Sequence, residues 1–263
     1  MPRYPSRSTS PSSFSFGPGP ISTALKAIIG ANVAVFVLMW LLPRSTQQIA
    51  TEMLGLVPFH VLSNRWAWQL VTYMFVHAGL FHIIFNMLAL WMFGTELERI
   101  WGTRFFVKFY FVTGVGAGVL TVLVSLLPLT ATHALYTSNI VGASGAIYGV
   151  LLAFALYFPD RKIYYMMLFP IPARVFVLII GAVAFFTSLS ESGGVANATH
   201  LGGLLVAYAY LTTLRKGPRL QLNPWAEVKY RWVKWRLASA KKRFDVYSGG
   251  RNNGPDRWDG RVH

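Results

Sequence analysis

The chain has 263 residues, of which 54% are hydrophobic and only 13% are charged, and its net charge is +15. Charged residues normally make up about a quarter of a soluble domain, so this composition excludes an ordinary soluble globular protein and indicates several membrane crossings. The sequence contains no cysteine. A disulfide framework, a thiol nucleophile and a thiolate metal site are therefore excluded.

The sequence divides into three regions along the chain. Residues 1–20 are rich in Ser, Pro and Gly, and we expect a disordered cytoplasmic segment. Residues 21–214 contain six apolar stretches that are typical of membrane helices. These stretches are Ile21–Leu42, Leu80–Leu97, Phe105–Leu127, Ser144–Phe158, Ala173–Leu189 and Ala198–Leu214. The predicted fold class is therefore all-α, a polytopic membrane protein with a bundle of six transmembrane helices.

The third region, residues 215–263, is a basic tail that holds 13 of the 24 Lys and Arg residues. Within it Trp225, Val228, Trp232 and Trp235 recur at three-to-four spacing among basic residues, which predicts an amphipathic helix on the membrane surface. A basic tail can also bind nucleic acid. Beside a membrane helix, however, the expected partner is the anionic lipid of the cytoplasmic leaflet, and we expect no nucleic-acid partner.

Basic residues alternate between the two ends of the predicted helices. The connection after the second apolar stretch carries Arg99 and Arg104, residues 128–143 carry no formal charge, and the next connection carries Arg161 and Lys162. The positive-inside rule then places both termini in the cytoplasm. We expect an integral multi-pass protein of the bacterial inner membrane.

This orientation brings several polar side chains to a similar depth. The second, fourth and sixth helices would all begin near the outer face, and their first turns carry His82, Asn86, Ser144 and His200. The fourth stretch covers only about 22 Å of a hydrocarbon core of about 30 Å, so Ser144 is expected to lie below the outer surface. Four polar side chains at one depth predict a functional site.

Ser144 follows a polar loop and begins an uncharged, apolar helix, with Gly142 just before it and Gly145 just after it. The free N–H groups and the dipole at a helix N-terminus favour negative charge, which suits an oxyanion formed by attack of the serine hydroxyl. Gly145 and Gly149 are spaced for close approach of a neighbouring helix, and Tyr148 lies one turn below Ser144. An incidental serine at a small-residue helix contact is the alternative interpretation.

His200 lies on a helix face built from small residues, because Gly203 and Ala207 follow at i+3 and i+7. Small faces on the fourth and sixth helices would let them pack closely and bring the imidazole to the Ser144 hydroxyl. A serine nucleophile needs such a base within about 2.6–3.2 Å. The alternative is that His200 only donates a hydrogen bond across the bundle.

His82 and Asn86 are i, i+4 neighbours that could direct donors at an oxyanion. Metal ligation with His77 or His200 is an alternative, but the sequence has no HExxH motif and no carboxylate in the outer halves of the helices. We therefore expect neither a metal site nor a cofactor.

Taken together, these pieces resemble the rhomboid family of intramembrane serine proteases. The resemblance is carried by Gly142-Ala143-Ser144-Gly145 with Tyr148, by His82-x-x-x-Asn86, and by His200-x-x-Gly203-x-x-x-Ala207. It implies that Ser144 is the nucleophile and His200 the base, that His82, Asn86 and the Ser144 N–H form the oxyanion hole, and that Tyr148 supports the histidine ring. Gly142 and Gly145 support the nucleophile loop.

The resemblance also implies an activity, namely hydrolysis of peptide bonds in or next to transmembrane segments of other proteins. Two positions depart from the family pattern: its Trp-Arg pair reads Trp68-Gln69 here, and the last small residue of the sixth helix is Ala207 instead of glycine. The alternative function is a non-proteolytic rhomboid-like binder of membrane helices. The intact serine and histidine argue against that alternative.

Overall fold

The computed structural model describes residues 20–128, 130–165, 169–188 and 194–213, together with Trp232, Val233 and Arg236. Contacts divide the chain into two units, residues 1–217 and 218–263. The first unit contains every element discussed below.

The described part of the first unit is built mainly of helices, with one small pair of strands. In chain order the elements are α1 (Thr23–Leu41), α2 (Arg44–Leu54), α3 (Pro58–Ser63), α4 (Gln69–Thr72), the 3₁₀ turn η1 (Tyr73–Phe75), α5 (Leu80–Ala89), the π turn η2 (Leu90–Gly94), α6 (Thr95–Trp101), α7 (Thr103–Val124), α8 (Thr130–Thr137), α9 (Ser144–Tyr157), β1 (Lys162–Tyr165), β2 (Phe169–Pro172), α10 (Ala173–Ser188) and α11 (Gly194–Thr213). Each of the six predicted apolar stretches lies within or across one of the longer helical segments.

In the part of the chain that the structure describes, three helical segments are long and apolar enough to cross a membrane: α1, the continuous segment Leu80–Trp101, and α7. The helices α9 and α10 are also apolar, but they are shorter. These segments make the chain an integral membrane protein. The count of six spans stays a prediction.

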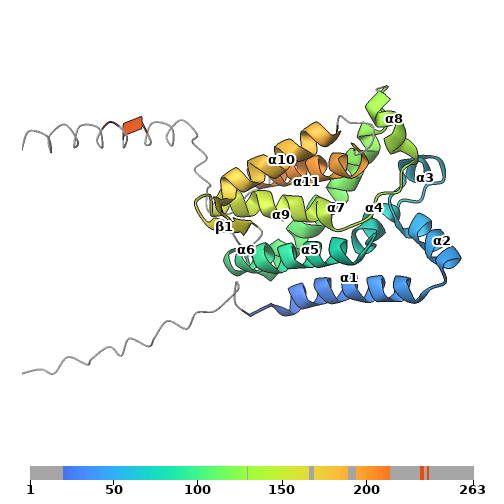
Figure 1. Ribbon diagram of the computed structural model, residues 1–263, viewed down its shortest axis with the longest axis horizontal. Coiled ribbons are helices and arrows are strands. Elements are labelled where there is room, and N and C mark those ends of the chain that lie inside the picture. The colour runs from blue at the N-terminus through green and yellow to red at the C-terminus, as the bar shows by residue number, and fades with distance from the viewer. Residues whose placement is uncertain are drawn as a thin grey trace, which may run out of the picture. The chain divides into compact units, whose positions relative to one another are not determined.

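The long helices run in alternating directions (Figure 1). The helices α1, α7 and α10 run one way, and α5 with α6, α9 and α11 run the other way. The short helices α2, α3, α4 and α8 gather at one end of the bundle, while α6 and the two strands lie at the opposite end. Within the bundle α11 packs against α7, α9 and α10.

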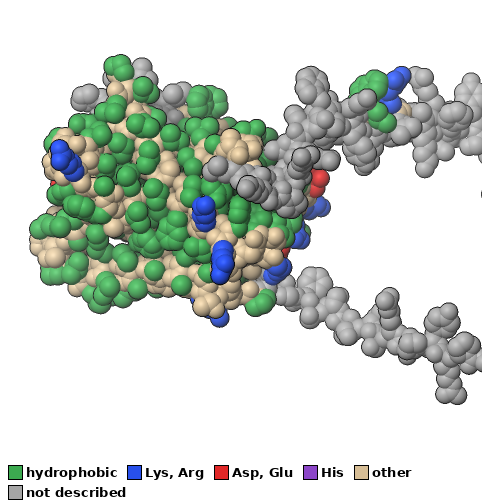
Figure 2. Space-filling model, turned by 180° about the vertical axis from the view of Figure 1, so that it is seen from behind, with side chains coloured by type: hydrophobic (Ala, Val, Ile, Leu, Met, Phe, Trp, Pro, Cys, Tyr) green, Lys and Arg blue, Asp and Glu red, His purple; other side chains and the backbone are tan. Residues whose placement is uncertain are grey.

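Most of the surface that the bundle shows from behind is hydrophobic (Figure 2). In that view the charged side chains gather mainly toward one end. Glu96 of α6 forms ion pairs there with Arg99 at 3.5 Å and with Arg161 at 3.6 Å. An apolar wall with charges toward one end is the distribution expected of a helix bundle in a bilayer.

The glycines of α7 are packing positions. A Cβ at Gly114 would meet the Met74 side chain, one at Gly116 would lie 2.7 Å from Cγ1 of Val206, and one at Gly118 would lie 3.2 Å from the Tyr73 ring. Gly114 and Gly118 lie one turn apart on the face toward η1 and Gly116 lies on the face toward α11, so small residues let both segments approach the backbone of α7.

Two features were not predicted from the sequence. The connection between the first two spans, residues 43–76, contains the short helices α2, α3 and α4 and the 3₁₀ turn η1. The connection before α10 forms an antiparallel ribbon, in which Ile163 pairs with Ile171. Apolar or aromatic residues at alternating positions favour such a strand pair, but each strand has only four residues and gives little periodicity to detect.

The second unit is described at three positions only. Trp232, Val233 and Arg236 are helical, and the Arg236 guanidinium lies 4.6 Å from the centroid of the Trp232 ring. Trp225, Val228 and Trp235, which belong to the predicted amphipathic helix, lie outside the described residues.

Candidate active site

Ser144 is the first residue of α9, as its position after the polar loop predicts. The residue before the helix is Ala143, and before that Gly142 adopts a φ of 119°, which L-residues with a side chain rarely reach. The Gly142 N–H donates a hydrogen bond to the Tyr73 carbonyl at 2.9 Å. This hydrogen bond holds the backbone that leads into α9. The N–H groups of the first turn have no acceptor within the helix, as at every helix N-terminus.

The structure brings His200 of α11 to Ser144, although 56 positions separate them in the sequence. His200 Nε2 lies 2.8 Å from Ser144 Oγ, within hydrogen-bonding distance. If Nε2 accepts from the hydroxyl, Nδ1 must carry the ring proton. Among the described residues Nδ1 has no hydrogen-bond partner. The described part of the chain thus forms a serine–histidine pair without a third, acidic group bonded to the imidazole.

Tyr148 stacks on this imidazole. Its ring lies parallel to that of His200, with an interplanar angle of 6° and centroids 4.2 Å apart. Since Tyr148 stands one turn after Ser144 on α9, the same helix face carries the hydroxyl and the surface on which the histidine rests. In this arrangement the imidazole ring rests on Tyr148 while its Nε2 faces the Ser144 hydroxyl.

Small residues make this approach possible. A Cβ at Gly203 would overlap the carbonyl oxygen of Gly145, so the backbones of α11 and α9 are in contact at this point. One turn further, a Cβ at Gly149 would lie 3.2 Å from the Cβ of Ala207. The predicted close packing is confirmed, and the alanine at position 207 fits because it faces a glycine.

His82 of α5 lies against the nucleophile loop. A Cβ at Gly142 would lie 2.7 Å from both Cε1 and Nε2 of the His82 ring, so only glycine leaves room for the imidazole there. Asn86, one turn later, is buried, and its Nδ2 donates to the His82 carbonyl at 2.8 Å. An amide nitrogen carries two N–H donors, so one remains for another acceptor. Sequence reasoning did not foresee the bond between Asn86 and its own helix.

His77 precedes α5 and stands edge-on to His82, with ring centroids 5.1 Å apart. Burial, together with the nearby His82, lowers the pKa of His77 to about 4, so the ring is neutral at physiological pH. Among the described residues no three His, Cys, Asp or Glu side chains are grouped so that they could hold a metal ion.

Two buried residues of the connection before α5 were assigned no role from the sequence. Tyr73 is fully buried, and its hydroxyl donates to the Gly114 carbonyl at 2.6 Å while its own carbonyl accepts from Gly142. Gln69, which stands at the position of the family arginine, is also fully buried, which is uncommon for a glutamine. Neither residue carries a periodic signal, because both lie in helices of only three or four residues.

Comparison with known proteins matches this arrangement to one family. The family model of the Rhomboid domain matches residues 64–217. Rhomboid protein 1, mitochondrial, of Saccharomyces cerevisiae is 31% identical over 208 residues, which cover 78% of this chain and 57% of the relative. Rhomboid protease GluP of Bacillus subtilis is 33% identical over 147 residues, 55% of this chain and 25% of the relative. Rhomboid protease AarA of Providencia stuartii is 26% identical over 217 residues, 76% of each chain.

The chain therefore spans little more than half the length of the yeast relative and a quarter of the Bacillus relative. The matched domain, however, covers more than half of this chain and includes His82, Asn86, Ser144 and His200. The helical fold, the serine–histidine contact and the matched domain together place this chain in the rhomboid family.

Proposed function

We propose that this protein is an intramembrane serine endopeptidase that hydrolyses peptide bonds in or next to transmembrane segments through a Ser144–His200 dyad. The observation that supports this proposal most directly is the 2.8 Å separation of His200 Nε2 and Ser144 Oγ inside a bundle of apolar helices. Two of the relatives are named rhomboid proteases. Family membership alone does not define the chemistry, and the proposal rests on this pair.

In the acylation step, His200 Nε2 accepts the hydroxyl proton as Ser144 Oγ attacks the carbonyl carbon of the substrate. The C–O bond forms, the carbonyl π electrons move to the oxygen, and a tetrahedral oxyanion results. The imidazolium then gives its proton to the leaving nitrogen as the C–N bond breaks. The products of this step are an ester on Ser144 and a free amine.

The oxyanion forms beside three donors. The Ser144 N–H belongs to the first turn of α9, where the helix dipole favours negative charge. We assign the other two donors to His82, whose ring contacts Gly142, and to the free N–H of the Asn86 amide. Such preorganised donors act mainly on the transition state.

Deacylation repeats the chemistry with water as the nucleophile. His200 removes a proton from water, the hydroxide adds to the ester carbonyl, and collapse of the second oxyanion returns the proton to Ser144 Oγ. No cofactor takes part in either step.

Substrates would be transmembrane proteins whose helices unwind locally. The scissile peptide bond of a helix is hydrogen-bonded to its neighbours, so it must leave the helix before Ser144 can reach it. The tail after residue 214 would contact anionic lipid through its basic residues.

The proposed topology has six spans with both termini in the cytoplasm, in a bacterial inner membrane. The alternation of helix directions in the described bundle is consistent with this arrangement. A reporter active only in the cytoplasm, fused after Arg215, should be active, and the same reporter inserted at Ser138 between α8 and α9 should be silent. The reverse pattern would overturn the topology and place Ser144 near the cytoplasmic face.

The activity is tested by labelling the purified protein with a serine-directed fluorophosphonate. We expect labelling at Ser144 and, with a transmembrane test substrate, cleavage within or beside its membrane segment as mapped by mass spectrometry. Absence of both reactions in folded protein that still binds membrane helices would favour the non-proteolytic binder instead.

A further inference from the structure

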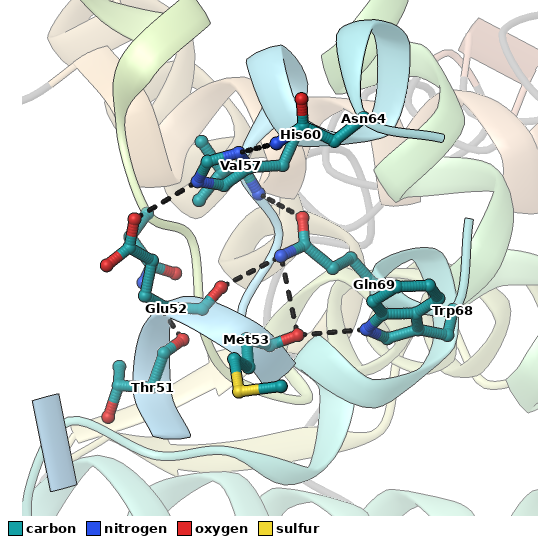
Figure 3. Close-up of polar contacts among 9 residues, drawn as sticks. Thr51, Glu52, Met53, Val57, His60, Asn64, Trp68 and Gln69 are labelled. Atoms are coloured by element: carbon teal, nitrogen blue, oxygen red, sulfur yellow. Dashed lines mark hydrogen bonds and ion pairs between the residues drawn. The ribbon is translucent and has the colours of Figure 1, made fainter. Parts of the chain in front are cut away.

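The side-chain amide of Gln69 joins the C-terminal end of α2 to the backbone that follows this helix. Its side chain is fully buried, its Oε1 accepts from the Val57 N–H at 3.0 Å, and its Nε2 donates to the Glu52 carbonyl at 2.8 Å (Figure 3). A second, longer contact joins Nε2 to the Met53 carbonyl at 3.4 Å. The amide nitrogen therefore bonds the end of α2, and the amide oxygen bonds the backbone just after it.

Gln69 belongs to a set of side chains that satisfy the C-terminal carbonyls of α2. The last four carbonyls of a helix have no partner within the helix. Here each of them accepts a hydrogen bond from a side chain elsewhere in the chain. The pairs are Asn139 Nδ2 to Thr51 at 2.9 Å, Gln69 Nε2 to Glu52 at 2.8 Å, Trp68 Nε1 to Met53 at 3.0 Å and Thr72 Oγ1 to Leu54 at 2.6 Å. The C-terminal end of α2 is therefore held in place mainly by side chains of α4 and of Trp68, which precedes α4.

The backbone just after α2 in turn holds the segment that leads to Ser144. Leu56 and Ile140 form an isolated antiparallel bridge, with hydrogen bonds of 2.8 and 2.9 Å in the two directions. Two residues further, the Gly142 N–H donates to the Tyr73 carbonyl. Since Gln69 bonds Val57, the neighbour of Leu56, and lies one helical turn before Tyr73, it fixes both backbone segments on which residues 140–142 rest.

We infer that Gln69 is a positioning residue for the active-site loop, acting through the Leu56–Ile140 bridge on Gly142. Gly142 fits directly against the His82 ring, so a shift of its backbone changes the space between His82 and Ser144. A neutral amide suits this place, because it meets one N–H donor and two carbonyl acceptors at once. The glutamine at the position of the family arginine therefore helps to position residues 140–142, which precede Ser144.

The inference is tested with Gln69→Met, which keeps the length of the side chain and removes its hydrogen bonds. The matched control is Gln48→Met, the same substitution at an exposed glutamine of α2. Full-length protein in detergent is compared by amide hydrogen exchange over residues 137–145, with α7 as the internal reference. We expect exchange at Ile140 and Gly142 to become at least about tenfold faster in Gln69→Met and to remain unchanged in Gln48→Met.

The catalytic readout rests on the proposed function. Misplacement of reacting groups by about 1 Å can cost up to about 100-fold in rate, so we expect kcat of Gln69→Met to fall about 10- to 100-fold with KM within about twofold. A lower melting temperature with unchanged exchange at residues 139–142 and unchanged kcat would overturn the inference, because Gln69 would then only cap α2. If the unaltered protein cleaves no substrate, the proposed function fails, while the exchange comparison still decides the role of Gln69.

Discussion

Replacing Ser144 by alanine, or His200 by alanine, should each reduce cleavage of a transmembrane substrate on the order of 10⁶-fold, to below ordinary detection. The two side chains act as one unit, because the hydroxyl is a weak nucleophile until Nε2, 2.8 Å away, takes its proton. The double variant should therefore be no slower than either single one. Single-turnover cleavage of a fluorescent substrate in proteoliposomes measures all three variants.

Ser138→Ala is the control for this prediction. Ser138 lies just after α8, and its exposed hydroxyl donates to the Ala134 carbonyl of the same helical turn, away from the Ser144–His200 pair, so its loss should leave the cleavage rate unchanged. The melting temperature is measured on the same samples to show that each variant is folded. Normal cleavage by folded Ser144→Ala or His200→Ala would refute the assignment of the dyad.

Replacing Asn86 by alanine should lower kcat by about 10²–10³-fold, or about 2.7–4 kcal/mol, with a much smaller change in KM. The free N–H of its amide is proposed to bind the oxyanion, which exists only in the transition state and the intermediate. The variant should still react with a fluorophosphonate at Ser144. Asn86→Asp should be slower still, because it loses the same N–H donors as the alanine variant and its ionised carboxylate also places a negative charge beside the oxyanion.

The chain offers a matched control at Asn32 of α1. Asn32 is fully buried and makes the same contact as Asn86, since its Nδ2 donates to the carbonyl four residues earlier at 2.8 Å. Asn32→Ala should therefore lower the melting temperature to a similar extent and leave kcat intact. Equal effects of both variants on kcat would show that Asn86 has only a structural role.

The sequence by itself predicted the helical membrane fold and the start of α9 at Ser144, because both depend on local signals. Runs of apolar residues identify membrane helices without reference to the rest of the chain. The small residues Gly145, Gly203 and Ala207 also predicted close packing of α9 and α11, since two helix faces built of small residues can approach each other closely. The approach of His200 to Ser144 follows from that packing, while their catalytic roles stay proposals.

Only the tertiary structure decided how the loop before Ser144 is held. The bridge between Leu56 and Ile140, the bond between Gly142 and Tyr73, and the buried amide of Gln69 all join segments that are far apart in the sequence or lie in helices of three or four residues. Such segments are too short for a periodic pattern, and their conformation is set by the partners that satisfy their backbone groups. The sequence around Gln69 does not show what its amide binds, because the Val57 N–H and the Glu52 and Met53 carbonyls reach it only in the folded chain.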